Sequence, residues 1–248
     1  MMKESLAKNG LMLGAFAVVT TALIALTFFG TQEKIDQQKQ QKLLSVLNEV
    51  VPSEFHDNAL YANCTEVNVD ELGGKKPHKV YRALLNNQPS ALVLEATAPD
   101  GYSGDIDILV GVSLGDTSLD ERSATQINSN ELTVLGVRVI EHKETPGLGD
   151  KIELAVSDWI MSFSLKPFSS DNLSIWKVKK DGGEFDQFTG ATITPRAVVG
   201  AVRETLLYVE ANKSALFAAP NLCTGAGTVK AEKVADVNDA QSQRVEAL

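Results

Sequence analysis

Residues 105–112 read DIDILVGV, and this stretch decides the class of the fold. Polar and apolar side chains alternate at its start and Ile, Leu and Val fill the rest, which is typical of a β-strand. Three further runs have the same character, at residues 79–84, 91–96 and 133–141. Together with the helical segments described next, these strands favour an α+β domain with a largely antiparallel sheet and flanking helices.

Helical patterns follow the strand-rich region. We expect a helix at residues 152–163 and a short strand at residues 175–178. Thr194 and Pro195 then form a helix start, with Thr as the N-cap and Pro as the first helical residue. The apolar face of this helix is marked by Val198, Val199, Val202, Leu206 and Val209.

The N-terminal region contains a long uncharged stretch, residues 11–30 (LMLGAFAVVTTALIALTFFG). About 20 residues at roughly 1.5 Å each match a hydrocarbon core of about 30 Å. A cleaved signal peptide would need a shorter apolar run and a small-residue cleavage site, so we favour a retained transmembrane helix. Lys3 and Lys8 precede it, which places residues 1–10 in the cytoplasm and the rest of the chain outside.

The chain beyond the span divides into three parts. Residues 31–52 are expected to form a membrane-proximal helix with an apolar stripe near its end, stopped by Pro52. Residues 53–223 are expected to form the globular domain. Residues 224–248 lack a pattern and are expected to be a mobile tail.

Charge and cysteine content exclude some classes of protein. The formal net charge is −9, and an acidic surface repels a phosphate backbone, which argues against a nucleic-acid partner. Cys64 and Cys223 have no zinc-site spacing, and the three histidines are widely separated, so no metal site is expected. The two cysteines are either a disulfide, if the domain lies in an oxidising compartment, or two unrelated thiols.

The most informative segment is residues 186–195, DQFTGATITP. Gly190 and Ala191 leave room for a bulky group beside the backbone, and the helix that follows presents free N–H groups and a positive dipole end. If Thr194 caps the helix, the Thr192 hydroxyl stays free. These features indicate a possible phosphate site, but taken alone they favour an ordinary capped helix after a turn.

The segment matches the pattern D-x-x-[ST]-G-A-T of FMN-binding domains that a flavin transferase modifies, at Asp186, Thr189, Gly190, Ala191 and Thr192. Two more stretches are similar to the same domain: residues 144–149 (ETPGLG) and residues 100–104 (DGYSG). Over residues 11–208 the chain resembles the G subunit of Rnf-type ion-translocating electron-transport complexes. It differs from members of that family in residues 116–130, which look inserted.

The resemblance implies that FMN is attached to Thr192 as a phosphoester, transferred from FAD by a magnesium-dependent flavin transferase. It also implies a place for the chain as a one-cofactor electron relay, with no catalytic residues of its own, in a complex that moves electrons between ferredoxin and NAD and translocates Na⁺ or H⁺. The complex would lie in a bacterial inner membrane with this domain in the periplasm. The cofactor-binding residues implied beside Thr192 are Asp186, Thr189, Gly190, Ala191, Glu144, Thr145, Gly147 and Leu148.

Neighbouring side chains have a second explanation in each case. Phe185 and Phe188 could contact the flavin ring, and core packing explains them as well. Arg196 is a candidate for the phosphate, although a cation in the first helical turn opposes the dipole. For the whole chain, the alternative function is a membrane-anchored binding or structural protein of the cell envelope without a redox role.

Overall fold

The computed structural model describes residues 2–115 and 132–223 and divides the chain into two units, Met1–Glu49 and Val50–Leu248. The first unit is helix α1 (Met2–Val50) without its last residue, Val50, which belongs to the second unit. Within it, the 24 residues Asn9–Gln32 are long and apolar enough to cross a membrane, and the mean hydropathy of an 18-residue window in this segment is 2.2. The hydroxyls of Thr20 and Thr27 donate to carbonyls one turn back, so these polar groups do not disqualify the span.

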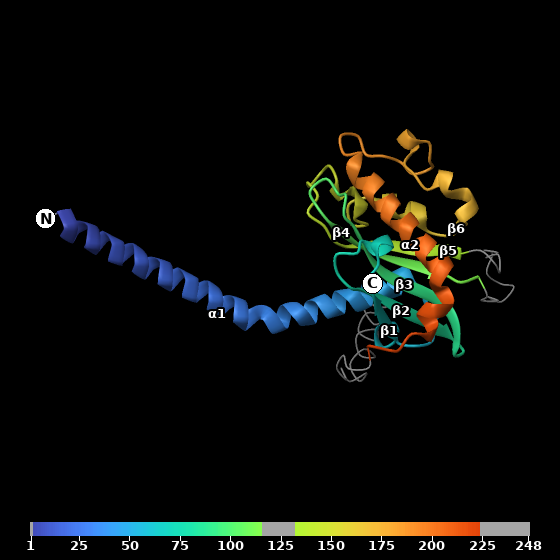
Figure 1. The fold of residues 1–248 in the computed structure, drawn as a ribbon, viewed down its shortest axis with the longest axis horizontal. Coiled ribbons are helices and arrows are strands. Elements are labelled where there is room, and N and C mark those ends of the chain that lie inside the picture. The colour runs from blue at the N-terminus through green and yellow to red at the C-terminus, as the bar shows by residue number, and fades with distance from the viewer. Residues whose placement is uncertain (1, 116–131, 224–248) are drawn as a thin grey trace, which may run out of the picture. The chain divides into compact units, whose positions relative to one another are not determined.

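The second unit is built on a six-stranded sheet in which every strand pairs antiparallel with the next along the chain (Figure 1). This confirms the α+β class and the four expected strands. The strands are β1 (Cys64–Val67), β2 (His78–Leu85), β3 (Gln88–Ala98), β4 (Ile106–Ser113), β5 (Leu132–Glu141) and β6 (Lys166–Phe168). Asn86 and Asn87 connect β2 to β3 with φ of 52° and 62°, the backbone of a two-residue hairpin turn.

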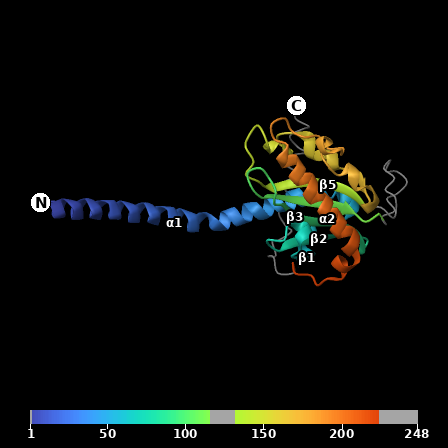
Figure 2. The ribbon, with the colours of Figure 1, turned by 45° about the horizontal axis from the view of Figure 1, so that its top comes forward.

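Helix α2 (Ile193–Ala218) lies across one face of the sheet, as both ribbon views show (Figure 2). Its predicted apolar face is confirmed, because each of the five marked residues is at most 1% exposed. Burying an aliphatic side chain of this size contributes about 1.5–3 kcal/mol, so this face fixes which side of α2 meets the sheet. The buried residues of the face are Val198, Val199, Val202, Leu206 and Val209.

The opposite face of β4 and β5 is covered at its centre by Val50, the first residue of the second unit. Gly111 and Gly136 are paired across these strands. A Cβ on Gly111 would collide with Val50, and a Cβ on Gly136 would make a tight contact with it. The distances from the Cβ positions to the Val50 carbonyl oxygen would be 2.8 Å at Gly111 and 3.1 Å at Gly136. Glycine therefore lets the backbone of Val50 lie directly on the sheet.

Two expectations about the segment between β5 and α2 were wrong. Residues 152–163 do not form one helix. They contain the last residue of one 3₁₀ helix, η4 (Asp150–Ile152), and the whole of another, η5 (Asp158–Phe163). Ser157 separates them with an extended backbone and its hydroxyl accepts the amide of Trp159, which starts η5. Short 3₁₀ turns let the side chains of Ile152, Trp159 and Phe163 reach the core without a continuous helix.

Residues 175–178 form no strand either. Ile175 is the last residue of another 3₁₀ helix, η6 (Ser170–Ile175), and of residues 175–178 only Val178 makes a β-bridge, to Phe185. Between these two lie η7 (Lys179–Asp181) and the turn at Gly182, whose φ is +86°. The expectations for residues 116–130 and 224–248 fall outside the described residues.

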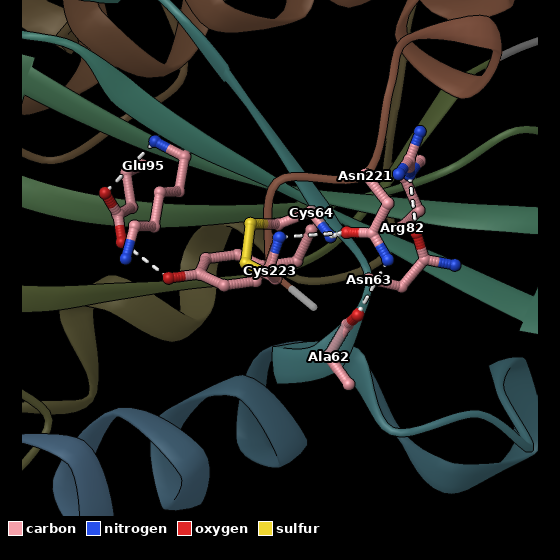
Figure 3. Close-up of a disulfide and its surroundings, with 9 residues drawn as sticks. Ala62, Asn63, Cys64, Arg82, Glu95, Asn221 and Cys223 are labelled. Atoms are coloured by element: carbon pink, nitrogen blue, oxygen red, sulfur yellow. Dashed lines mark hydrogen bonds between the residues drawn. A yellow bond between two sulfur atoms is a disulfide. The ribbon is translucent and has the colours of Figure 1, made fainter. Parts of the chain in front are cut away.

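The C-terminal end of α2 is fastened to β1 and β2 by a disulfide and two polar side chains (Figure 3). Cys64 and Cys223 are bonded, with their Cα atoms 5.3 Å apart, which decides between the two explanations left open for these residues. Asn221 accepts the backbone amides of both cysteines through Oδ1, each at 3.0 Å. We call the disulfide, Asn221 and Arg82 the C-terminal clasp.

Arg82 supplies the remaining contacts of the C-terminal clasp. Its guanidinium is almost fully buried and donates to the carbonyls of Leu216, Phe217 and Ala219, at the end of α2, and to Asn63 Oδ1. The last carbonyls of a helix have no partner within the helix, so Arg82 satisfies groups that burial would otherwise leave unpaired. Burial lowers the pKa of Arg82, and the guanidinium remains charged.

Candidate functional site

Helix α2 begins two residues earlier than expected, and this changes the role of Thr194. Its first residue is Ile193, and Thr192 occupies the N-cap position with φ −69° and ψ −27°. The prediction that Thr194 caps the helix was wrong, because its hydroxyl donates to Glu144 instead. Pro195 is the third helical residue rather than the first, a position that still needs no N–H.

The Thr192 side chain is half-buried, and its hydroxyl makes no hydrogen bond to any residue in the described part of the chain. The amides of Ile193 and Thr194 likewise have no acceptor among the described residues. Free amides at the start of a 26-residue helix carry the positive end of its dipole, and they favour an anion at this point. The geometry therefore offers an unengaged hydroxyl beside a place suited to a phosphate.

Aromatic packing on the core side holds the turn that leads to Thr192. Phe188 is buried, with its ring centroid 5.1 Å from that of Trp159, and its carbonyl accepts the amide of Ala191. Trp159 also donates its indole N–H to the Asp186 carbonyl at 2.8 Å. Gly190 completes the turn with φ of +83°, a conformation that favours glycine.

The outer edge of this turn is open to solvent. Thr189 and Gly190 are exposed and Ala191 is half-buried. The Asp186 carboxylate is exposed and pairs with Lys179 at 2.6 Å. A large group attached at Thr192 would therefore meet small or movable side chains on this side.

The loop at residues 144–149 lies against the same turn. The loop forms a hydrogen-bonded turn, in which the Thr145 carbonyl accepts the amides of Leu148 and Gly149, both at 3.1 Å. Gly147, with φ of +79°, makes this turn possible, and a Cβ there would meet no atom within 4 Å. A Cβ on Gly190 would lie 3.8 Å from Leu148 Cδ2, so the two sequence motifs meet in space.

Glu144 is buried, whereas the next four residues of its loop are exposed, and both of its carboxylate oxygens are engaged. Oε1 accepts the amide of Ser103 at 2.9 Å and Oε2 accepts the hydroxyl of Thr194 at 2.5 Å. Ser103 belongs to the third motif, residues 100–104, which the structure thus brings to the same place. Sequence reasoning assigned no role to Ser103 and the wrong role to Thr194, because spacing gives no sign of a contact 50 residues apart.

Each of the three segments that meet at Glu144 carries an exposed apolar side chain. Leu148 and Ile193 are 46% and 45% exposed, and Tyr102, beside Ser103, is 68% exposed. Ile193 directly follows Thr192 in the chain. Exposed apolar side chains of this kind are suited to contact with a planar ring.

The charged and aromatic candidates have other partners. Arg196 forms two hydrogen bonds to Asp181, and this ion pair lowers the pKa of the Asp181 carboxyl and raises that of Arg196. Phe185 and Phe188 are at most 7% exposed and pack with Phe163 and Trp159, which supports core packing for both. Arg196 is therefore engaged elsewhere, and the feature described here that attracts a phosphate is the start of α2.

The arrangement defines a class of protein. A threonine hydroxyl and helix amides that have no partner among the described residues, together with exposed apolar side chains, fit a phosphate-bearing ring cofactor. Residues 122–207 match the family model of the FMN-binding domain. Residues 1–50 match the model of the RnfG N-terminal region. The chain thus carries an FMN-binding domain behind an N-terminal membrane span.

Curated relatives give the family. The chain is 54% identical over 223 residues to the G subunit of the ion-translocating oxidoreductase complex of Pseudoalteromonas atlantica, covering 90% of this chain and 96% of the relative. The corresponding G subunits of Vibrio atlanticus and Shewanella amazonensis are 49% and 48% identical, again over 90% of this chain and over 100% and 96% of their own lengths. The chain belongs to this family, the G subunits of ion-translocating oxidoreductase complexes, and with its one apolar span it is a single-pass membrane protein.

Proposed function

We propose that this chain is an electron-transfer subunit of an Rnf-type complex and that it carries FMN as a phosphoester on Thr192. The observation that carries the proposal is the Thr192 hydroxyl, which is unengaged among the described residues and stands at the start of α2 beside amides without acceptors there. A phosphate esterified at this point would accept those amides and lie at the positive end of the helix dipole.

Attachment is a group transfer that needs an enzyme and a donor. A flavin transferase with Mg²⁺ would direct the Thr192 oxygen at the FMN-side phosphorus of FAD. The new bond joins that oxygen to phosphorus, the phosphoanhydride bond breaks, AMP leaves, and the hydroxyl proton is released. The chain contributes a reachable hydroxyl and the helix amides that receive the phosphate.

Other residues of the site have separate roles in this proposal. Gly190, Ala191 and Gly147 leave space for the cofactor, and Leu148 provides apolar contact for its ring. Thr145 closes its loop through its carbonyl, which fixes Leu148 in place. Asp186 and Thr189 lie on the exposed side of the turn, where the transferase must approach.

The bound flavin supplies the redox chemistry, accepting and releasing electrons. The chain then needs no acid–base groups of its own, and its part is to hold the cofactor beside the other subunits. The complex would couple electron flow between ferredoxin and NAD to translocation of Na⁺ or H⁺. A membrane anchor and a covalent bond both raise the effective concentration of the flavin near its partners.

The orientation in the membrane follows from two independent features. Lys3 and Lys8 precede the span, which favours a cytoplasmic N-terminus. The Cys64–Cys223 disulfide favours an oxidising compartment for the domain. Both support an inner-membrane protein with its FMN-binding domain in the periplasm.

The proposal is tested by intact mass of the full-length protein after co-expression with a flavin transferase, followed by peptide mapping. We expect a gain equal to FMN less one water, located on the peptide that contains Thr192. Thr192→Ala should abolish the gain and leave the fold intact, and Thr192→Ser, which keeps a hydroxyl, should retain it. An unmodified wild-type mass with an active transferase would refute the proposal and favour an envelope protein without a redox role.

A further inference from the structure

Glu144 joins the three segments that meet at Thr192. Its carboxylate is 5% exposed and accepts the amide of Ser103, in the loop between β3 and β4, and the hydroxyl of Thr194, in the first turn of α2. Its own amide donates to Nδ1 of His142 at 3.0 Å, at the end of β5. Glu144 thus connects the end of β5 through its amide, and the loop and the helix through its carboxylate.

The carboxylate has little freedom to move. Each oxygen accepts a hydrogen bond from a different segment, so a shift toward one donor lengthens the bond to the other. Gly149 closes the remaining side, because a Cβ there would lie 2.6 Å from Oε2 and 3.0 Å from the Thr194 hydroxyl oxygen. The position of the first turn of α2 is therefore set by the length of the Glu144 side chain.

We propose that Glu144 is a positioning residue: through Thr194 it fixes the first turn of α2, and with it the Thr192 hydroxyl, in the geometry that flavin transfer requires. The inference rests on the proposed function and assigns Glu144 no contact with the cofactor. Its burial and its two internal bonds direct its action to Thr194, two residues from the attachment point.

Side-chain length and charge can be separated by substitution. Glu144→Asp keeps the charge but is one methylene shorter, so it cannot reach both donors. Glu144→Gln keeps the length: its carbonyl accepts the Ser103 amide, and its NH₂ group donates to the Thr194 oxygen. Positioning therefore predicts that the Gln variant retains the wild-type rate of transfer and that the Asp variant does not.

Glu95 offers a matched control beside the disulfide, at the C-terminal end of α2 (Figure 3). Its carboxylate also accepts one hydroxyl and one backbone amide, from Tyr81 at 2.8 Å and from Lys79 at 3.1 Å. Glu95→Asp therefore disturbs the same kind of bonds on the same sheet, away from Thr192. A loss of flavin transfer caused only by weaker folding would appear in both Asp variants.

The experiment measures the initial rate of FMN incorporation into full-length protein in detergent, with transferase, FAD and Mg²⁺, below the lowest melting temperature of the set. We expect Glu144→Asp to be slower than wild type by about tenfold or more, since misplacing a reacting group by about 1 Å has effects of this size. Glu144→Gln and Glu95→Asp should stay near the wild-type rate.

Thr194→Val provides a second variant if Glu144→Asp does not fold, because it removes only the hydroxyl donor, and it should also slow transfer. Wild-type rates in both Glu144→Asp and Thr194→Val, or equal slowing in Glu144→Asp and Glu95→Asp, would overturn the positioning role while leaving the attachment to Thr192 intact. A wild-type protein that gains no FMN at all would instead refute the proposed function.

Discussion

Removing the Cys64–Cys223 disulfide should destabilise the FMN-binding domain strongly, because the bond closes a long loop. The two cysteines are 159 residues apart. The loop-entropy relation gives about 5 kcal/mol at 25 °C for a loop of this length, and measured losses for native disulfides span about 2–5 kcal/mol. We expect a loss within this range, since Arg82 and Asn221 keep the C-terminal clasp partly closed without the bond.

The assay is thermal unfolding of full-length Cys64→Ala/Cys223→Ala protein in detergent, followed by tryptophan fluorescence. Both tryptophans of the chain, Trp159 and Trp176, are buried in the domain, so the signal reports this unit and not α1. A loss of about 2–5 kcal/mol corresponds to a drop in Tm of roughly 5–15 °C for a domain of this size.

Reductant provides the control for this prediction. It should lower the Tm of the wild-type protein toward that of the double variant and leave the variant unchanged. The reasoning would be refuted if the variant melted together with wild type and reductant affected neither protein, because the two cysteines would then not be bonded.

Two further predictions concern the sheet. Gly111→Ala should lower the free energy of unfolding by about 2 kcal/mol, since its Cβ would lie 2.5 Å from Val50 Cγ1. The control is Gly200→Ala on α2, where a Cβ would meet no atom within 4 Å, and it should be neutral or raise the free energy of unfolding by up to about 1 kcal/mol. Urea unfolding of both variants measures the difference. Burial lowers the pKa of His78, so its neutral form stabilises the fold above pH 6.5 and this stability declines as pH falls toward the lowered pKa. His78→Gln should therefore flatten the fall of Tm as the pH is lowered below 6.5, and an unchanged slope would exclude His78 as its cause.

Four strands and α2 could be predicted because their apolar residues form recognisable runs or faces along the chain. Residues 106–112 lie in β4, which is buried at every position except the half-buried Asp107, and the apolar face of α2 is almost fully buried. Strands β1 (CTEV) and β6 (KPF) were not foreseen, because a run of three or four residues, here with polar or Pro residues, shows no periodicity. The 3₁₀ segments were not foreseen either, since tertiary packing of Trp159 and Phe163 sets their positions.

The site could be predicted at the level of motifs but not of contacts. The segments at residues 144–149 and 186–195 do meet, with Thr192 at the start of α2. The bonds of Glu144 to Ser103 and Thr194 depend on how three distant segments pack, which no local pattern encodes. The choice of Thr194 as the cap failed for the same reason, because a buried carboxylate competes for its hydroxyl.

The order of the strands has a consequence for how the domain is made. Each strand pairs with the one before it, so the sheet can grow from β1 to β6 in the order in which the chain emerges, without waiting for a distant partner. Cys64 stands at the first strand and Cys223 beyond the last helix. The disulfide can therefore form only after Cys223 has emerged, as the last step of assembly. Until then the Cys64 thiol is free to form a mixed disulfide with another molecule.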